Sequence, residues 1–201
     1  MRFFDFLFPP RVDENLVRNL AADAFLAEAA PRLVPVTRPG TVALLPFSTA
    51  AVRAAIHEAK YHGNRRAFAL LAAALTDYLC DADEGFRNPV IVPVPLGRAR
   101  KRERGFNQVE EIARRAAKKV GIAVDAELLT RTRETVSQVS LPRAAREENM
   151  RGGFRAAQRA DPARTYILVD DVTTTGATLQ AAVDALADAG AAHIVPLALA
   201  H

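Results

Sequence analysis

The sequence predicts an α/β fold in which a parallel sheet lies between helices. Two short apolar runs, residues 90–92 and 167–169, show no polar alternation, as expected of strands buried on both faces of a parallel sheet. Each run leads through a turn into a helical pattern. The second run, a helix expected over residues 176–189 and a last strand over 193–199 together predict a right-handed parallel crossover.

The first eighty residues are predicted to be mostly helical. Apolar residues recur at helical spacing after Asp13, Pro and Gly interrupt the segment after residue 30, and Ser48 is a suitable N-cap. We therefore expect a helix over 13–30, a connector over 31–41, a strand over 42–47, a helix from Ser48 to about Gly63 and a buried helix over 65–79. This part contains no residues from which we can infer a reaction.

The region between the two buried strands predicts a helix, a strand and a long loop. Val109, Ile112 and Val120 lie on one face of a helix that ends at Gly121. Residues 125–129 favour a strand, whereas residues 130–153 have no sustained apolar period. We expect this last segment to be a mobile loop or lid, because long functional loops often close over ligands.

Composition is ordinary for a soluble globular chain: of 201 residues, half are hydrophobic and a quarter are charged. The single cysteine, Cys80, excludes a disulfide framework or a cysteine-based zinc site within one chain, and its apolar surroundings predict that it is buried. Residues 1–10 are apolar, but Asp5 and two prolines interrupt them, so we expect a packing arm and not a signal peptide. No apolar run is long enough to span a membrane, and we expect a cytoplasmic protein.

Charge is distributed unevenly along the chain. Residues 98–159 have a net charge of +8, whereas the remaining residues have a net charge of −4. A basic block of this kind favours phosphate-rich partners, either small ligands or nucleic acid.

Residues 167–179 have the composition of a site for a phosphorylated sugar. Three apolar residues are followed by Asp170 and Asp171, then by a Thr-rich turn with one glycine, then by a helix. The backbone N–H groups of such a turn and the dipole of the helix favour an anion, and Gly176 lets it approach the backbone. The two carboxylates accept hydrogen bonds from sugar hydroxyls and hold Mg²⁺. The alternative is a plain strand–turn–helix corner in which these side chains only cap the helix.

The same stretch resembles the phosphoribosyl pyrophosphate (PRPP) motif of type I phosphoribosyltransferases. The resemblance implies that Asp170 and Asp171 are catalytic residues that hold the ribose hydroxyls and Mg²⁺. It also implies that the 5′-phosphate is bound by Thr173, Thr174, Thr175, Gly176, Ala177 and Thr178. Leu96, Gly97 and Arg98 are then expected to border the pyrophosphate, and a mobile loop over residues 131–149 is expected to close over the ligand, with Arg131 stabilising the leaving pyrophosphate.

Further motifs resemble one family, the ComF (competence protein F) family of phosphoribosyltransferase-like proteins. These are Lys60-Tyr61-His62-Gly63, Val92-Pro93-Val94-Pro95-Leu96, Arg104-Gly105-Phe106-Asn107-Gln108 and the spaced set Gln138, Leu141, Arg146, Asn149 and Phe154. The resemblance implies a type I phosphoribosyltransferase fold and a cytoplasmic role in natural transformation. The implied partners are incoming single-stranded DNA, a helicase and a recombination mediator.

The chain departs from that family in one respect. Family members usually have a four-cysteine zinc module near the N-terminus, but Val12 and Asp13 stand where its first cysteines would begin. We therefore expect no zinc, and we divide the chain into a helical arm over residues 1–40 that replaces the module and a phosphoribosyltransferase-like domain over residues 41–201.

Two functional classes stay open. The first is an Mg²⁺-dependent phosphoribosyltransferase with an unidentified acceptor, although no general base is evident and the N-terminal helices show no ring of polar or aromatic residues for a base. The second is a PRPP-responsive adaptor that binds single-stranded DNA through Arg100, Lys101, Arg102 and Arg104. Only Phe106 and Phe154 are available in the basic block for stacking, so we expect mainly electrostatic DNA binding. The alternative for the basic run is a solvated helix start or loop.

Overall fold

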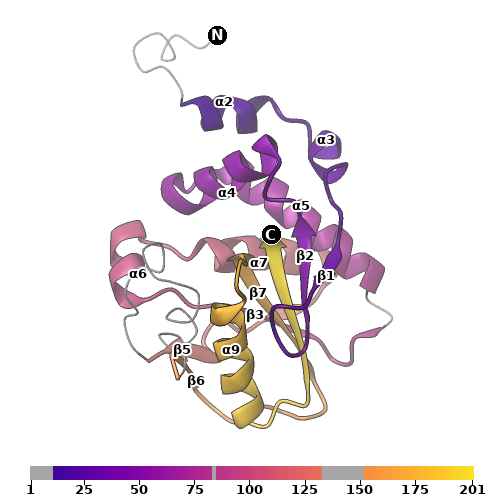
Figure 1. The fold of residues 1–201 in the computed structure, drawn as a ribbon, viewed down its shortest axis with the longest axis vertical. Coiled ribbons are helices and arrows are strands. Elements are labelled where there is room, and N and C mark those ends of the chain that lie inside the picture. Colours follow the sequence, from indigo (N-terminus) through magenta and orange to yellow (C-terminus); the bar gives the residue numbers. More distant parts are fainter. Residues whose placement is uncertain (1–10, 83–84, 133–151) are drawn as a thin grey trace.

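A six-stranded sheet forms the centre of the protein in a computed structural model, which describes residues 11–82, 85–132 and 152–201. The strand order is β1-β2-β8-β7-β3-β4, and only the β1–β2 pair is antiparallel. The strands are β1 (Arg32–Val34), β2 (Thr41–Leu45), β3 (Val90–Pro93), β4 (Ala123–Val124), β7 (Thr165–Val172) and β8 (His193–Ala200). The predicted α/β class, a mostly parallel sheet flanked by helices, is confirmed (Figure 1).

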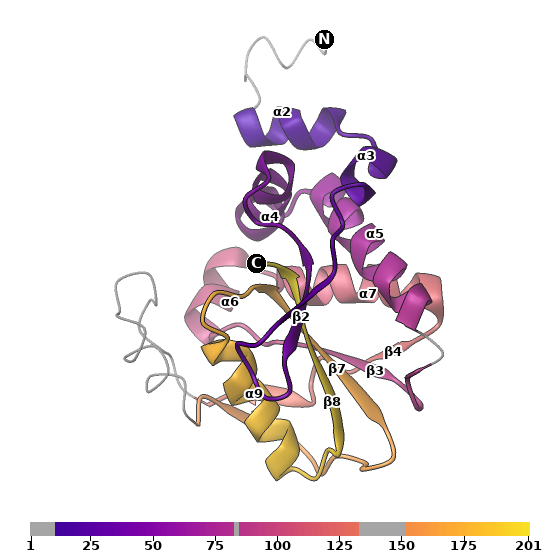
Figure 2. The same ribbon diagram turned by 45° about the vertical axis from the view of Figure 1, so that its right-hand side comes forward.

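Helices cover both faces of this sheet. The helices α4 (Ala50–His62), α5 (Arg65–Ala82) and α7 (Gln108–Val120) pack on one face, and α9 (Ala177–Asp188) packs on the other (Figure 2). Along β7, Ile167 and Val169 belong to the first core, whereas Tyr166 and Leu168 belong to the second. This explains the unbroken apolar run, because both faces of β7 are buried.

The N-terminal helix predicted over residues 13–30 is two helices, so that prediction was wrong in detail. Helix α2 (Val12–Asn19) and helix α3 (Ala22–Leu26) are separated by extended backbone at Leu20 and Ala21. The Arg66 guanidinium donates a hydrogen bond of 2.7 Å to the Leu20 carbonyl, which stabilises the break. Both helices lie over α4 and α5 at the end of the molecule opposite α9 (Figure 1).

Most other predicted elements are present, with shifted ends. Thr49, and not Ser48, is the N-cap residue of α4, and its hydroxyl donates a hydrogen bond to Glu28 instead of capping. Of the strand predicted over residues 125–129, only Leu129 is in a strand; the residues before it form a bend, because the Asp125 carboxylate accepts hydrogen bonds from the N–H groups of Glu127 and Leu128. Cys80 is exposed near the end of α5, which contradicts its predicted burial.

The segment predicted to be a loop over residues 130–153 begins and ends in a two-stranded antiparallel sheet. Strand β5 (Leu129–Arg131) pairs with β6 (Phe154–Ala156), and Thr130 lies opposite Arg155. The predicted lid between them falls largely on residues 133–151, which lie outside the described residues, and this range includes Gln138, Leu141, Arg146 and Asn149. The packing arm predicted over residues 1–10 also lies outside the described residues. The proposed domain boundary at residue 40 stays a prediction. Within the described chain, no helix has the length and apolar character needed to cross a membrane.

Candidate functional site

A cavity of about 340 Å³ lies at the carboxyl ends of β3 and β7, where ligands bind in open parallel sheets. Helix α4, the segment after β3, helices α6 (Arg98–Arg104) and α7, strand β5 and the end of β7 contribute to its wall. Its lining residues are Lys60, Tyr61, Val94, Pro95, Leu96, Arg100, Arg104, Gln108, Val109, Arg131, Asp170, Asp171, Val172 and Thr178. Four cationic and two acidic side chains thus face one space, which favours a phosphate-bearing ligand.

Asp171 is held on both carboxylate oxygens by the protein itself. Oδ2 accepts a hydrogen bond of 2.6 Å from the Gln108 amide and lies 3.1 Å from the Lys60 ammonium. Oδ1 accepts a hydrogen bond of 2.7 Å from the N–H group of Val172. Asp171 therefore ties α4 and α7 to β7, a role that the sequence did not indicate.

The Asp170 side chain lines the cavity. Within residues 11–82, 85–132 and 152–201, its carboxylate accepts one hydrogen bond, from the N–H group of Asp171 at 2.8 Å. Burial and the neighbouring Asp171 charge raise the pKa of Asp170 to about 7, although Lys60 and Arg131 act in the opposite direction. Both acids lie inside β7, which extends to Val172, and not beyond the strand end as the sequence predicted.

The Thr-rich turn lies beside the cavity, and only Thr178 of it contributes to the lining. The N–H group of Thr173 donates a hydrogen bond of 3.0 Å to the Ala200 carbonyl, so it is not available to a phosphate as we had expected. Thr174 is exposed, and the Thr175 hydroxyl accepts a hydrogen bond from the N–H group of Ala177.

The structure gives a packing reason for Gly176, whereas its predicted role beside a phosphate stays a prediction. It has φ +75°, and a Cβ at this position would lie 2.5 Å from the Val36 carbonyl oxygen. The glycine therefore accommodates the connector between β1 and β2, which is also tied to α9 by the hydrogen bond from the Arg38 N–H group to Gln180.

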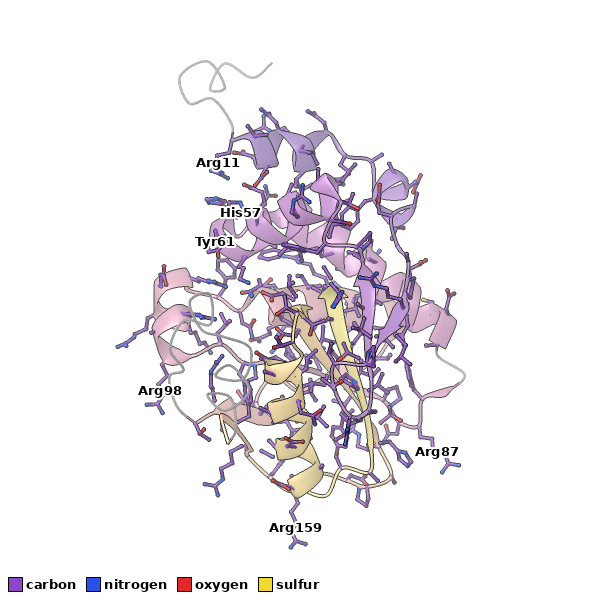
Figure 3. The ribbon with its side chains drawn as sticks, viewed as in Figure 1. Arg11, His57, Tyr61, Arg87, Arg98 and Arg159 are labelled. Carbon is purple, nitrogen blue, oxygen red and sulfur yellow. The ribbon has the colours of Figure 1, made fainter. Side chains whose placement is uncertain are left out.

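The basic run forms helix α6, which has one side toward the cavity and one side toward solvent. Arg100 and Arg104 line the cavity together with Leu96, whereas Lys101 and Arg102 are exposed. Gly97 is the buried N-cap residue of the helix, and Arg98 points away from the molecule (Figure 3). Some of the residues predicted to border pyrophosphate or to bind nucleic acid therefore line the cavity, and others are exposed to solvent.

The Arg104-to-Gln108 motif connects this helix to the acids. The Arg104 guanidinium donates to Gln108 Oε1 at 3.1 Å, and Gln108 in turn donates to Asp171. The Asn107 side chain caps α7 by accepting from the N–H group of Val109, and it donates to the Val94 carbonyl. The motif therefore fixes α6 and α7 against the ends of β3 and β7.

Sequence reasoning did not assign a role to Lys60 and Tyr61, although both belong to a motif that marked their position. Lys60 contacts Asp171, and Tyr61 lies at the cavity with Arg104 5.1 Å from its ring centre. The His57 ring is 4.9 Å from the Tyr61 ring. Tyr61 contacts Arg104, Arg104 contacts Gln108, and Gln108 contacts Asp171. Asp171 in turn contacts Lys60, the neighbour of Tyr61 in the sequence, so these five residues form a closed ring of contacts. Helix α4 thus contributes one aromatic side chain to the cavity, whereas the expectation that no ring of such residues is present stays a prediction.

Donor atoms of His57, Glu58 and His62 lie within 4.8 Å of one another, a spacing that suits a metal ion. However, Arg11 donates to both oxygens of the buried Glu58 carboxylate at 3.0 Å, and Asn64 donates to one of them. Although burial opposes it, Arg11 and Asn64 lower the pKa of Glu58. The carboxylate is therefore already neutralised by a structural ion pair.

No family model matches the chain. Among curated proteins, it is 32% identical over 142 residues to the DNA utilization protein YhgH of Salmonella typhi, covering 69% of this chain and 62% of that protein. It is 36% identical over 104 residues to YhgH of Escherichia coli K12, covering 52% and 45%. It is 34% identical over 91 residues to competence protein F of Haemophilus influenzae, covering 44% and 40%. The chain thus spans about three fifths or less of the length of these relatives, and they confirm the resemblance noted in the sequence.

Among solved structures, the chain is similar to adenine phosphoribosyltransferase from Leishmania tarentolae. The TM-score is 0.40 at 13% sequence identity, and the similarity covers 89% of this chain and 74% of that one. This likeness is loose, and the α/β fold class rests on the sheet topology described above.

Proposed function

Because the chain is a homologue of the DNA utilization protein YhgH and of competence protein F, we propose that it is a phosphoribosyltransferase-like protein of DNA uptake that binds PRPP in the cavity at Asp170. The observation on which the proposal depends is the position of an acid pair at the carboxyl end of β7, opposite three arginines. Such a cavity accommodates a ligand with a diol at one end and a pyrophosphate at the other.

The ligand's groups correspond to separate parts of the wall. The ribose hydroxyls donate to Asp170, and the pyrophosphate lies against Arg100, Arg104 and Arg131. The 5′-phosphate lies at Thr178, beside the N-terminus of α9, where the helix dipole favours negative charge. A volume of about 340 Å³ is within the range of sites for small ligands.

Asp170 fits Mg²⁺ as a single carboxylate ligand, whereas Asp171 does not while Lys60 and Gln108 hold it. Mg²⁺ is commonly bound by one or two carboxylates together with substrate phosphates. Bound there with PRPP, the ion would neutralise charge on the pyrophosphate.

As an enzyme, the protein would break the bond between the ribose C1 carbon and the pyrophosphate oxygen and form a bond from that carbon to an acceptor. Arg100, Arg104 and Arg131 surround the position where the negative charge of the leaving pyrophosphate increases. The acceptor is not identified by these residues.

The second candidate is a PRPP-responsive adaptor for single-stranded DNA. The contact from Arg104 through Gln108 to Asp171 favours it, because this contact joins the basic helix α6 to the acid pair. Occupation of the cavity would then change the surface that α6 presents to DNA.

Calorimetric titration with PRPP and Mg²⁺, followed by an assay for released pyrophosphate, tests the proposal. We expect binding by the unchanged protein and by Asp77→Asn, which alters an exposed acid on α5, and no measurable binding by Asp170→Asn. Pyrophosphate release that a nucleobase or nucleic acid accelerates would support the enzyme, and binding without release would support the adaptor. Equal binding by Asp170→Asn would disprove the site.

A further inference from the structure

The two aromatic residues expected to stack on DNA bases are packed inside the protein. Phe154 is 5% exposed and lies beneath Arg131, whose guanidinium is 5.4 Å from its ring centre. Phe106 is partly buried and packs edge-on against Phe68, with ring centres 5.8 Å apart. Phe154 cannot stack on a base without leaving the core, and stacking on Phe106 would compete with its contact to Phe68.

Tyr61 is the aromatic residue that the structure presents at the mouth of the cavity. It lies in the last turn of α4, is 57% exposed and lines the cavity. The other large apolar side chains that are exposed in the described part of the chain, Val12 and Leu33, do not line it. In Figure 3, Tyr61 lies at the end of α4 nearer to α6, and His57 lies above it toward α2.

The side chains around Tyr61 are held in place by contacts within the protein, and they suit a flat, electron-rich ligand. Arg104 lies 5.1 Å from the ring centre, and the hydrogen bond from Arg104 to Gln108 restrains its guanidinium. Lys60, the preceding residue, is held by Asp171. Because these groups are already ordered, a ligand that stacks here loses little additional side-chain entropy in the protein.

We propose that Tyr61 and Arg104 form a stacking site for one unpaired nucleobase, presented by single-stranded DNA that follows α6. A base is a flat ring that stacks on both a phenol and a guanidinium, and a stacked base needs no sequence-specific hydrogen bonds. The exposed Lys101 and Arg102 lie on the same helix and are available to the DNA phosphates. The proposal rests on the DNA-related function proposed above and adds the residue that contacts the base.

Fluorescence of 2-aminopurine tests this directly, because stacking quenches it and the protein contains no tryptophan to interfere. A short oligonucleotide with one central 2-aminopurine is titrated with the unchanged protein, Tyr61→Phe, Tyr61→Ala and Leu33→Ala. Leu33→Ala is the matched control, because it shortens an exposed apolar side chain outside the cavity. We expect quenching by all proteins except Tyr61→Ala, whose affinity falls about 5-fold to 150-fold, the range for stacking of one base.

Equal quenching and affinity for Tyr61→Ala and Tyr61→Phe would overturn the proposal. Free 2-aminopurine riboside is titrated in parallel, and we expect much weaker binding because it lacks the phosphates that α6 contacts. Riboside binding as tight as that of the oligonucleotide would overturn DNA as the source of the base. PRPP titrations of the same variants separate this result from the cavity assignment, since loss of PRPP binding by Asp170→Asn does not depend on Tyr61.

Discussion

At the scale of single residues, the adjacent acids Asp170 and Asp171 have different environments, although they look equivalent in the sequence. Asp171 has both oxygens occupied by Lys60, Gln108 and the backbone. Asp170 faces the cavity with a raised pKa. A ligand or metal ion can therefore engage Asp170 without breaking protein contacts, whereas engaging Asp171 would require Lys60 or Gln108 to move.

The raised pKa of Asp170 predicts how ligand binding depends on pH. Its pKa is about 7 instead of the ordinary 3.8, so below pH 7 the carboxyl group is largely protonated and cannot hold Mg²⁺. We expect the affinity for PRPP with Mg²⁺ to rise about tenfold per pH unit between pH 5.5 and 7 and then to level off. Calorimetry across pH 5.5–8.5 measures this.

Asp77→Asn should reproduce the full pH profile, which controls for a general effect of removing one carboxylate. The ligand itself titrates in the same range, so a measurement without ligand is required as well. The free energy of unfolding provides an independent check, because a folded pKa above the unfolded one means that stability falls as pH rises from about 4 to 7. A profile of unfolding free energy that is identical in Asp170→Asn would contradict the raised pKa.

At the scale of elements, a buried ion pair reinforces the packing of α2 on α4, beside the His57–Asp13 contact and the core residue Val17. The Glu58 side chain is fully buried, and Arg11 binds both of its oxygens from the residue before α2. Figure 3 shows Arg11 above His57, the residue that precedes Glu58 in α4. The arrangement means that the helical arm covers a carboxylate which would otherwise lie buried without a full counter-charge.

We predict that Arg11→Ala costs about 2 kcal/mol of unfolding free energy, because among the residues that the structure describes Asn64 is then the one remaining side-chain hydrogen-bond donor to the Glu58 carboxylate. The melting temperature should fall by about 4 to 8 °C. Arg114→Ala, which removes an exposed pair with Glu110 in α7, is the control and should cost about 0.5 kcal/mol or less. Because Arg11 lowers the pKa of Glu58, its contribution is present above about pH 4.5 and is lost at lower pH.

The elements that the sequence predicted well are those with a local pattern. The helix over α7 was predicted from apolar spacing and from the glycine that ends it, and β3 and β7 were predicted from their apolar runs. The extension of β7 to Val172 was missed because it depends on pairing with Ala200, and the Lys60–Asp171 contact was missed because it joins residues far apart in the chain. Neither contact leaves a periodic signal in the sequence.

The same limit applies to the candidate site. The sequence indicated both acids, Arg104 and Thr178, which the structure brings to one cavity. It did not reveal that Asp171 accepts a hydrogen bond from Gln108, because the position of one amide side chain in a helix gives no recognisable pattern in the sequence. The close approach of Val36 to Gly176 was also missed, because a local pattern cannot reveal a residue from another part of the chain.

At the scale of the whole molecule, the cavity at Asp170 and the outer surface of α6 are adjacent but separable. Arg100 faces the cavity, whereas Lys101 and Arg102 are exposed and outside its lining. We predict that Lys101→Ala with Arg102→Ala weakens binding of single-stranded DNA and leaves the PRPP affinity unchanged. The slope of log affinity against log salt concentration should fall by the amount expected for the loss of about one to two phosphate contacts. Filter binding at several salt concentrations measures the slope.

Lys118→Ala with Lys119→Ala is the matched control, because these two lysines are also exposed and lie at the far end of α7. An unchanged salt slope for the α6 variant, or an equal change for the α7 variant, would show that DNA does not follow α6. Adding Arg100→Ala to the α6 variant should then reduce PRPP affinity as well, because Arg100 lines the cavity.

The sheet order also has a consequence for how the protein is made. Strand β8 lies between β7 and β2, and it pairs Leu197 with Val42, 155 positions earlier in the chain. At about 5–20 residues per second, a ribosome needs roughly 8–30 s to add that length, and β2 has no partner on that side meanwhile. Nascent chains arrested before residue 193 should therefore be cleaved by protease within β2, and chains arrested after β8 has emerged should resist. The cell's holding chaperones would be needed during this interval.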